Sequence, residues 1–392
     1  MTVITKTKGF PSRTIIRVTF LEHLAAEWQS DLQFLVRSPT SDEASVHRRL
    51  LQIGLPNVAL LTTSLDVFDD WQGPAVLDER GGMQEGDVAA ISDDMKYAHI
   101  LIRETDVHHT IFLTNRCNSK CLMCSQPPTP QDDSWLINEA CQVAVHMRAS
   151  PALLGFSGGE PLLLGERLRE VFDTFSQVHP STELDVLSNG RLLADKHFSK
   201  ELLSGLNKQI SWMVPLYGHA DFLHDFVVQS HGAFEETLAG LIHLHTHQQS
   251  IQIRTVLIRP VLEHLPALCE FIGKNLPFIR EVALMACEPI GFALANREVS
   301  DIDLRDWRAE LSAGIRTLER ARIKVILMNA PLCALSPDLW KYAHKSISDW
   351  KRVFAPECAE CSVQADCAGL FTWHFHREQA MKINRIKGIT HV

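Results

Sequence analysis

Long apolar runs are missing from this 392-residue sequence. No stretch of eighteen apolar residues occurs, so the length that a membrane-spanning helix needs is not reached. The first residues, Met1 to Arg13, also lack the apolar core of a secretory signal peptide. We therefore expect a cytoplasmic protein with no membrane partner.

Blocks of positive charge are missing as well. The chain has 38 Lys and Arg residues against 47 Asp and Glu residues, which gives a formal net charge of −9. Nucleic-acid-binding domains usually carry a basic excess on one face, so we expect no nucleic-acid partner. The remaining composition, 45% hydrophobic and 22% charged, is that of a globular protein long enough for more than one domain.

Cysteine, in contrast, is present and unevenly distributed. Disulfides are rare in the reducing cytosol, and tight cysteine groups there more often bind a metal or an iron–sulfur cluster. Seven of the ten cysteines fall into two such groups, one of Cys117, Cys121 and Cys124 and one of Cys333, Cys358, Cys361 and Cys367.

Pattern divides the chain into the segments 1–108, 109–322 and 323–392. The first mixes a helical stretch at Leu21–Leu35 with short strand-like pieces, which indicates an α+β region of unknown role. The second alternates strands with amphipathic helices, as βα units of a parallel sheet do. The third is a cysteine-rich tail.

The second segment predicts a partial (β/α)6 barrel of the TIM type, because six βα units make three-quarters of the eightfold barrel. A seventh strand-like run, Lys324–Met328, follows it. The six expected barrel strands are Thr110–Thr114, Ala152–Phe156, Glu183–Leu187, Ile210–Leu216, Ile251–Ile258 and Glu281–Met285.

The first cysteine group directly follows the first barrel strand, as Cys117-Asn-Ser-Lys-Cys121-Leu-Met-Cys124. Three thiolates can hold three irons of a [4Fe–4S] cube, which normally takes four cysteines, and leave one iron open. An open iron can chelate S-adenosylmethionine (SAM), and an injected electron then yields a 5′-deoxyadenosyl radical. Barrel active sites form in such strand-end loops. A structural zinc site is the alternative, but it typically needs four ligands.

Two later strands end in small and polar residues. After the second strand, Gly158-Gly159-Glu160-Pro161 offers close backbone approach and a carboxylate for an ammonium group. After the third strand, Ser188-Asn189-Gly190 offers groups suited to ribose hydroxyls. Arg254 in the fifth strand could reach the SAM carboxylate, and a salt bridge within the sheet is the equal alternative.

The ordered set Cx₃Cx₂C, GGEP and SNG resembles the radical SAM superfamily. The resemblance implies that the first cysteine group ligates the cluster and that Gly158–Pro161 binds the cofactor, with Gly158, Gly159 and Glu160 on the methionine amine. It also places Ser188 and Asn189 near the ribose. The family usually has an aromatic residue before the third cysteine, where this chain has Met123, whose thioether can pack on adenine or cluster.

The second cysteine group could close a four-ligand site, and tetrahedral zinc remains an alternative for it. Its C-x₂-C-x₅-C spacing after a radical SAM barrel resembles the auxiliary-cluster extension of peptide-modifying members. Phe371 stands where the full extension has its next cysteine, so the shortened, one-cluster form is the match. The resemblance favours an auxiliary [4Fe–4S] cluster on Cys333, Cys358, Cys361 and Cys367.

Several local patterns resemble, more narrowly, the radical SAM maturases of His-Xaa-Ser repeat-peptide systems, in particular the family member called C. This resemblance implies a ribosomally made precursor peptide as substrate, a companion radical SAM maturase, and an electron donor such as flavodoxin or ferredoxin. The segments that carry it are Cys124–Pro128, Asp132–Trp135, Pro215–Tyr217 and Ser346–Trp350, with His224-Asp225 before Gly232-Ala-Phe234.

Two other functions stay open at this point. A radical SAM enzyme could act on a small molecule or transfer a methyl group. Alternatively, the chain could be a metal-stabilised scaffold without catalysis, which presents a substrate to a partner maturase. GGEP and SNG argue against the scaffold, because a scaffold needs no cofactor cradle.

Overall fold

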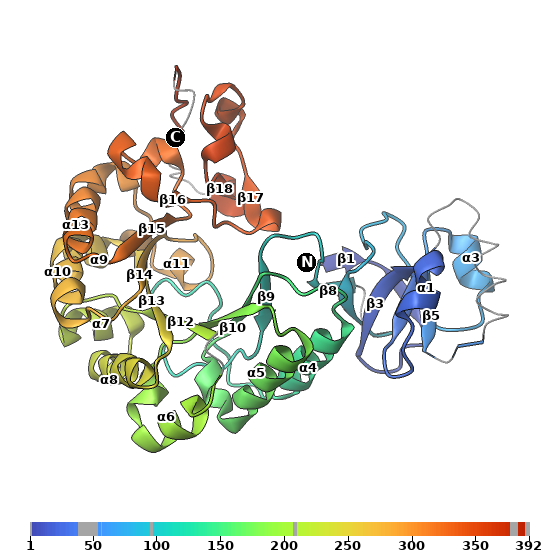
Figure 1. Ribbon diagram of the computed structural model, residues 1–392. Coiled ribbons are helices and arrows are strands. Elements are labelled where there is room, and N and C mark those ends of the chain that lie inside the picture. The colour runs from blue at the N-terminus through green and yellow to red at the C-terminus, as the bar shows by residue number, and fades with distance from the viewer. Residues whose placement is uncertain are drawn as a thin grey trace. The chain divides into compact units, whose positions relative to one another are not determined.

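The chain forms two compact units, shown in the computed structural model in Figure 1. The structure describes residues 2–37, 54–55, 57–94, 97–206, 210–376 and 383–388. Unit 1 consists of Met1–Phe112, Ser134–Leu154 and Glu170–Thr182. Unit 2 consists of Leu113–Asp133, Gly155–Arg169 and Glu183–Val392. Among the described residues, no helix is both long and apolar enough to cross a membrane.

The sheet of unit 1 closes on itself. Its strand order is β1-β8-β7-β3-β4-β5-β6-β2, yet Thr5 alone separates β1 from β2 in sequence. The two ends of the sheet are therefore adjacent, and closure covers edges that would otherwise be free to pair. The strands are β1 (Thr2–Ile4), β2 (Lys6–Lys8), β3 (Thr14–Phe20), β4 (Phe34–Arg37), β5 (Val58–Thr62), β6 (Ala75–Leu77), β7 (Val88–Ile91) and β8 (Tyr97–Ile102).

Alternating apolar residues give this sheet two buried faces. Leu35 on β4 packs into a cluster on one face, while its neighbours Phe34 and Val36 pack into a second cluster on the other. Two short helices, α1 (Leu21–Glu27) and α3 (Leu65–Asp70), contribute to the second cluster through Leu24 and Phe68. Successive residues of a strand face opposite sides, so both faces are apolar where both are covered.

The expected helix at Leu21–Leu35 is correct only in its first half, because α1 ends at Glu27 and β4 begins at Phe34. Between them, the side-chain amide of Asn57 donates to the carbonyl oxygens of Gln29 and Leu32 and holds this connection in a non-helical path. Local periodicity cannot show a contact from a residue so distant in sequence. The sequence also indicates a polar loop around Ser38–Glu43, which lies outside the described residues.

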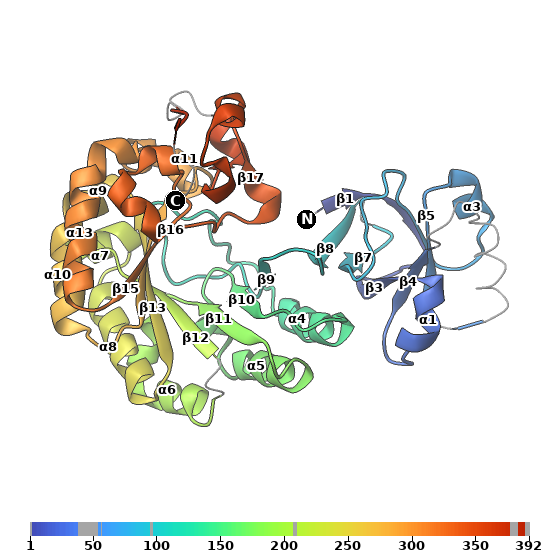
Figure 2. The ribbon, with the colours of Figure 1, turned by 45° about the horizontal axis from the view of Figure 1, so that its top comes forward.

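The second sheet has the order β16-β15-β14-β13-β12-β11-β10-β9, and the neighbouring strands from β11 to β16 pair in parallel. Each expected barrel strand is present, which confirms the curled partial-barrel fold (Figures 1 and 2). The strands are β9 (His109–Phe112), β10 (Leu153–Ser157), β11 (Glu183–Leu187), β12 (Ile210–Pro215), β13 (Ser250–Leu257), β14 (Glu281–Ala286), β15 (Lys324–Met328) and β16 (Ala343–His344).

Helices of unit 2 cover the outer side of this curled sheet (Figures 1 and 2). On α13, for example, an apolar stripe of Leu311, Ile315 and Leu318 is buried. Two further helices in the described part of the chain are α4 (Trp135–His146) and α5 (Glu166–Val178). The unit 2 helices are α6 (Lys196–Leu203), α7 (Asp221–Val228), α8 (Ala233–Thr246), α9 (Arg259–Glu263), α10 (Leu265–Asn275), α11 (Phe292–Ala295), α12 (Arg297–Ser300) and α13 (Arg308–Arg320).

The tail after β16 consists of single 3₁₀ turns and one short antiparallel pair. The pair is β17 (Arg352–Val353) with β18 (Leu370–Phe371). So little regular structure leaves few backbone hydrogen bonds to hold the described part of this tail, which contains Cys358, Cys361 and Cys367, while Cys333 lies before β16. A bound metal or cluster stabilises such a segment by binding the folded form alone.

An ion pair buried in unit 1 gives a test of this fold. The Asp87 carboxylate is fully buried and accepts from Nε and Nη2 of Arg103, at 3.2 and 2.9 Å. Replacing Arg103 by Met leaves a buried carboxylate without its cation. We expect Arg103→Met to destabilise unit 1 by about 3–5 kcal/mol, measured by urea unfolding.

Arg80→Met is the matched control, because Arg80 is exposed. We expect this variant to stay within about 0.5 kcal/mol of wild type. Equal effects of the two substitutions would contradict the role of the buried pair.

Candidate active site

The three sequence motifs lie in loops at the carboxyl ends of adjacent strands. The first cysteine group follows β9, Gly158–Pro161 follows β10, and Ser188–Gly190 follows β11. Because parallel strands end at one edge of a sheet, the structure brings the three loops together there. Hydrogen bonds between the loops, described next, show how closely they meet.

The two glycines of the GGEP loop allow its backbone to contact the segment that leads to Cys117. The Gly159 amide donates to the Thr114 carbonyl at 2.6 Å, and the Glu160 amide donates to the Arg116 carbonyl at 2.8 Å. A Cβ atom on Gly159 would lie 2.2 Å from the Arg116 carbonyl oxygen, and one on Gly158 would lie 2.6 Å from that of Thr114. The glycines are therefore required for loop-to-loop packing.

Glu160 connects the second loop to the third. Its side chain is fully buried, and Oε1 accepts from the Leu162 amide at 2.9 Å and the Ser188 hydroxyl at 2.7 Å. Oε2 accepts from the Asn189 amide at 2.6 Å. Burial raises the pKa of Glu160, while these hydrogen bonds act in the opposite direction. A carboxylate has about four lone-pair sites, so three protein donors leave one for a ligand ammonium.

The cysteine loop itself is held from two sides. From the third loop, Asn189 Nδ2 donates to Asn118 Oδ1 at 2.6 Å, and Arg191 Nη1 donates to the Asn118 carbonyl at 2.6 Å. From the carboxyl end of α7, the Val228 and Val227 carbonyls accept from the amides of Lys120 and Leu122. These bonds fix the backbone on which the three thiols stand.

The segment after β14 holds the last turn of the cysteine loop. The Phe292 amide donates to the Cys124 carbonyl at 2.8 Å, and Asn296 Nδ2 donates to the Leu122 carbonyl at 2.9 Å. Gly291, with φ of +60°, allows this contact, since its Cβ would lie 2.4 Å from the Cys124 carbonyl oxygen. Met123 is buried within this turn.

All three thiols of the first group are half-buried, and burial controls their acidity. Burial raises the pKa of Cys117 to about 11 and that of Cys121 to about 12, and the neighbouring cysteines raise both further. Amides of Ser119 and Asn118 donate to the Cys117 sulfur and oppose this rise. Bound iron or another cation replaces these protons, so the site suits a metal-thiolate centre better than a free thiolate nucleophile.

The spacing of the thiols bears on which centre fits. Thiolates on tetrahedral zinc, at about 2.3 Å from the metal, lie about 3.8 Å from one another. Among the described residues, the one group of three potential ligand atoms all within 4.8 Å of one another is that of His23, Glu27 and Glu85. Among the described residues, no three cysteine sulfurs lie that close together.

The tail cysteines meet around one pocket. Cys333, Cys358, Cys361 and Cys367 all line a space of about 390 Å³. Backbone amides of Leu332 and Gly369 each donate to the Cys367 sulfur at 3.4 Å. Four converging thiols with amide donors fit a closed four-ligand cluster.

A second hollow, of about 550 Å³, lies where β14 and β15 end and the tail returns to the barrel. Cys287 and Asn329 line it from the strand ends, and Phe371 and His374 line it from the tail. It shares Pro331, Gly369 and Leu370 with the tail-cysteine pocket. The hollow therefore adjoins the tail-cysteine pocket at the carboxyl ends of β14 and β15.

Arg254 does not join the motif loops in this structure. Its Nε donates to Gln252 Oε1 at 2.7 Å, and its guanidinium interacts electrostatically with Asp185, in the middle of β11, and with Glu281, the first residue of β14. Burial raises the pKa of Asp185 to about 6, and Arg254 opposes this rise. In this structure Arg254 is held inside the sheet by its hydrogen bond to Gln252.

The His-Asp pair before Gly-x-Phe has a structural role. Asp225 accepts from the amides of Gly232 and Phe234 at 2.6 and 2.8 Å and so caps the start of α8. His224 Nδ1 accepts from the Tyr217 amide at 3.2 Å, and burial lowers the pKa of His224 to about 4. The pair therefore shapes the loop after β12, and the neutral imidazole stacks beside Tyr217.

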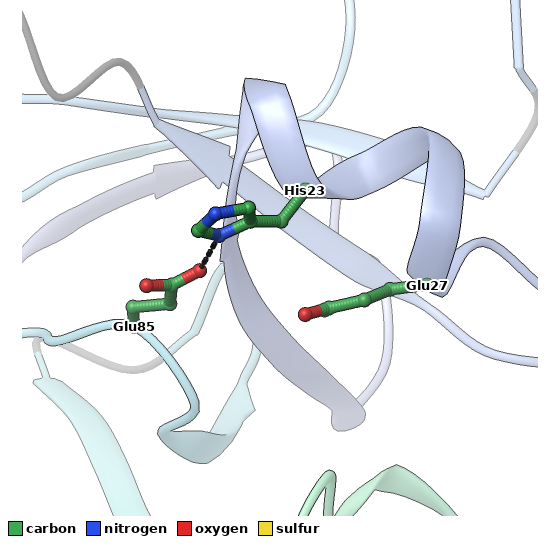
Figure 3. Close-up of side chains that lie close together, drawn as sticks. All are labelled: His23, Glu27 and Glu85. Carbon is green, nitrogen blue, oxygen red and sulfur yellow. Dashed lines mark hydrogen bonds and ion pairs between the residues drawn. The ribbon is translucent and has the colours of Figure 1, made fainter.

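A His-Glu-Glu group in unit 1 has the proximity of a metal site but already has a cation. Figure 3 shows His23 and Glu27 of α1 with Glu85 of the loop before β7. Arg148 Nη1 lies 3.1 Å from Glu27 and 3.3 Å from Glu85, and His23 bonds to Glu85. The guanidinium pairs with both carboxylates, so we assign this group as part of an ion-pair network.

Sequence reasoning missed two residues that shape the site. Asp133 accepts from the Thr114 hydroxyl at 2.9 Å and from the Asn115 amide, and so holds the start of the cysteine loop. Arg191 holds the same loop through hydrogen bonds to the Asn118 carbonyl and the Ser119 hydroxyl. Arg191 directly follows the SNG motif, and this position was the signal available for it.

Comparison with known proteins gives one sequence relative and several remote structures. No family model matches the chain. A probable GTP 3′,8-cyclase of Methanocella arvoryzae is 34% identical over 134 residues, which cover 33% of this chain and 41% of that protein. The chain thus aligns with less than half of this relative's length.

Among solved structures, Streptococcus suis SuiB bound to S-adenosylmethionine matches over 57% of this chain and 47% of its own, with 15% identity and a TM-score of 0.42. A radical SAM methyltransferase from Sphaerobacter thermophilus matches over 62% and 72%, with 12% identity and the same TM-score. Similarity at this level carries no inference about substrate.

The curled parallel sheet is the partial-barrel fold that the sequence predicts, and the three motifs follow its strands in the expected order. The geometry adds that the three motif loops form one hydrogen-bonded assembly at the carboxyl edge of that sheet.

Glu160→Gln tests this assembly without any cofactor. The amide of Gln turns a donor toward Asn189, Ser188 or Leu162, which all donate now, and an unsatisfied buried donor costs about 1–3 kcal/mol. We expect faster hydrogen–deuterium exchange in peptides 160–165 and 187–192. Glu166→Gln, at an exposed residue, is the control and should leave both peptides unchanged.

His224 predicts a pH dependence of stability. Its folded pKa of about 4 lies below the unfolded value of about 6.5, so only the unfolded chain takes up this proton in between. The contribution of the neutral His224 side chain to the free energy of unfolding is complete above pH 6.5 and is lost as the pH falls toward 4. At pH 5 the loss is about 2 kcal/mol. His224→Asn keeps an acceptor for the Tyr217 amide, and urea unfolding at pH 7.5 and 5.0 should show a smaller loss for the variant than for wild type.

Proposed function

We propose that this chain is a radical SAM enzyme that modifies a ribosomally made precursor peptide of the His-Xaa-Ser repeat type. A companion radical SAM maturase and an electron donor such as flavodoxin or ferredoxin are its proposed partners. The main support is the assembly at Glu160, which joins the GGEP and SNG loops beside a three-thiol loop held by Arg191, α7 and Asn296.

In this proposal, Cys117, Cys121 and Cys124 hold a [4Fe–4S] cluster with one open iron. Gly158–Pro161, Ser188 and Asn189 bind SAM, with Arg254 as a further candidate for its carboxylate. Together, cluster and SAM supply a 5′-deoxyadenosyl radical that abstracts hydrogen from the substrate. The protein's own task is to keep the thiols buried and the loops fixed, so that the reacting groups meet away from water.

The hollow between the ends of β14 and β15 and the tail is the proposed place of the substrate. Its lining combines apolar residues with a few polar ones, as ligand sites do. The tail cysteines, around the adjoining pocket, are proposed ligands of an auxiliary [4Fe–4S] cluster. A peptide side chain in this hollow would lie beside the pocket of the tail cysteines.

A small-molecule substrate is the second candidate function, because the sequence relative is named as a probable GTP 3′,8-cyclase. Methyl transfer belongs to the same alternative. A scaffold without catalysis has less support, since it gives no reason for three loops to be joined around a buried carboxylate.

Anaerobic reconstitution with iron and sulfide tests the proposed function. We expect about eight irons per chain and deoxyadenosine from SAM under dithionite. The variant Cys117→Ala/Cys121→Ala/Cys124→Ala should lose about four irons and all cleavage. Cys141→Ala, outside both groups, is the control and should retain both.

The outcomes separate the candidates. SAM cleavage with only about four irons per chain would indicate that the tail cysteines bind zinc instead of a second cluster. Tight zinc binding with no SAM cleavage would support the scaffold. Deuterium that passes from a labelled His-Xaa-Ser peptide into deoxyadenosine would support the peptide substrate. Transfer from a labelled nucleotide but not from the peptide would support the small-molecule alternative.

A further inference from the structure

Arg191 stands between the SNG turn and the first cysteine loop. Its Nη1 donates to the Asn118 carbonyl at 2.6 Å and to the Ser119 hydroxyl at 3.0 Å, and its own backbone amide donates to Asn189 Oδ1 at 3.0 Å. The side chain is only 10% exposed. A planar guanidinium can make these bonds and still present Nε to another partner.

That partner is Glu236, in the first turn of α8. Arg191 Nε donates to Glu236 Oε2 at 2.6 Å, and the Glu236 side chain is 45% exposed. The pair is therefore asymmetric: the cation is buried against the cysteine loop, while the anion stays partly in solvent. Solvent screens the anion more than the cation, so a net positive field reaches the thiols.

The field of Arg191 acts on this site more than on distant parts of the chain. Its charge influences Cys121, the most buried of the three thiols, and also Glu160 and His224 nearby. The Glu160 carboxylate accepts hydrogen bonds from the loops after β10 and β11, and its charge raises the pKa of Cys117. Arg191 supplies a positive charge that acts in the opposite direction, at Cys121.

We propose that Arg191 is a positioning residue with two effects: it fixes the shape of the cysteine loop, and it raises the reduction potential of the cluster there, with Glu236 limiting that rise. The inference rests on the proposed function, since it requires a cluster on Cys117, Cys121 and Cys124. It goes further by naming the residues that set how readily that cluster is reduced.

The physical basis is the charge that reduction adds. One electron from the external donor makes the thiolate-bound cluster more negative by one unit, and net charge is a main determinant of cluster potential. A nearby cation stabilises the reduced form and a nearby anion destabilises it. Removal of Arg191 and removal of the Glu236 charge must then shift the potential in opposite directions, which purely structural damage would not do.

The test is an EPR-monitored redox titration of the reconstituted full chain. Arg191→Gln should shift the first cluster to a more negative potential, and Glu236→Gln should shift it to a more positive one. We expect at least a threefold change in the reduced-to-oxidised ratio at fixed potential, equivalent to about 28 mV for a one-electron couple. The signal of the tail cluster, obtained from the Cys117→Ala/Cys121→Ala/Cys124→Ala variant, is subtracted.

Two further variants separate the effects. Glu235→Gln removes the same charge from the adjacent exposed residue of α8 and should leave the potential near that of wild type. Arg191→Lys keeps the positive charge but loses the planar guanidinium that makes several hydrogen bonds at once. The potential of the first cluster should therefore stay near that of wild type while the iron content of the variant falls. Arg191→Gln should also bind less iron.

Shifts of the same sign for Arg191→Gln and Glu236→Gln, or no shift in either, would overturn the inference. If Arg191→Gln does not fold, Glu236→Gln and Glu235→Gln decide it. A wild-type chain that binds no cluster on the first cysteine group would overturn the proposed function instead, so the two failures are distinguishable.

Discussion

A buried carboxylate is the constraint on which this site depends. Glu160 has no access to solvent, so the protein itself must supply its hydrogen-bond donors. Those donors come from its own turn and from Ser188 and Asn189, which ties the loop after β10 to the loop after β11. Gly159 then brings the same loop within hydrogen-bond distance of Thr114, ahead of the cysteines. Three loops far apart in sequence thus behave as one structural unit.

The acidity of the thiols follows from the same burial. Without a bound cation, the pKa values of Cys117 and Cys121 lie far above neutral pH, so these cysteines stay protonated. In the tail, burial also raises the pKa of Cys333 and Cys358. A metal or cluster that replaces the thiol protons is stabilised by the backbone amides that donate to the sulfurs. Both cysteine groups combine burial with such backbone N–H···S bonds.

Some residues with the strongest sequence signals serve the fold more than the chemistry. Asp225 caps α8 through Gly232 and Phe234, and Gly158 and Gly159 are small because neighbouring backbone would otherwise clash. Arg254 bonds to Gln252 inside the sheet. Conversely, Arg191 and Asp133 gave little signal, although they hold the cysteine loop in place. A sequence motif therefore predicts a position in the fold more reliably than it predicts the function of its residues.

The amino-acid order alone was enough to give the strands of the curled sheet, the order of the motifs after them and the grouping of seven cysteines, because each depends on local periodicity or spacing. The tertiary structure decided what lies between distant residues. Closure of the first sheet through β1 and β2, the end of α1 at Glu27, the bonds of Glu160 and the reach of Arg191 to Asn118 all depend on contacts across many residues. Such contacts exist only once the chain has packed, and no local pattern encodes them.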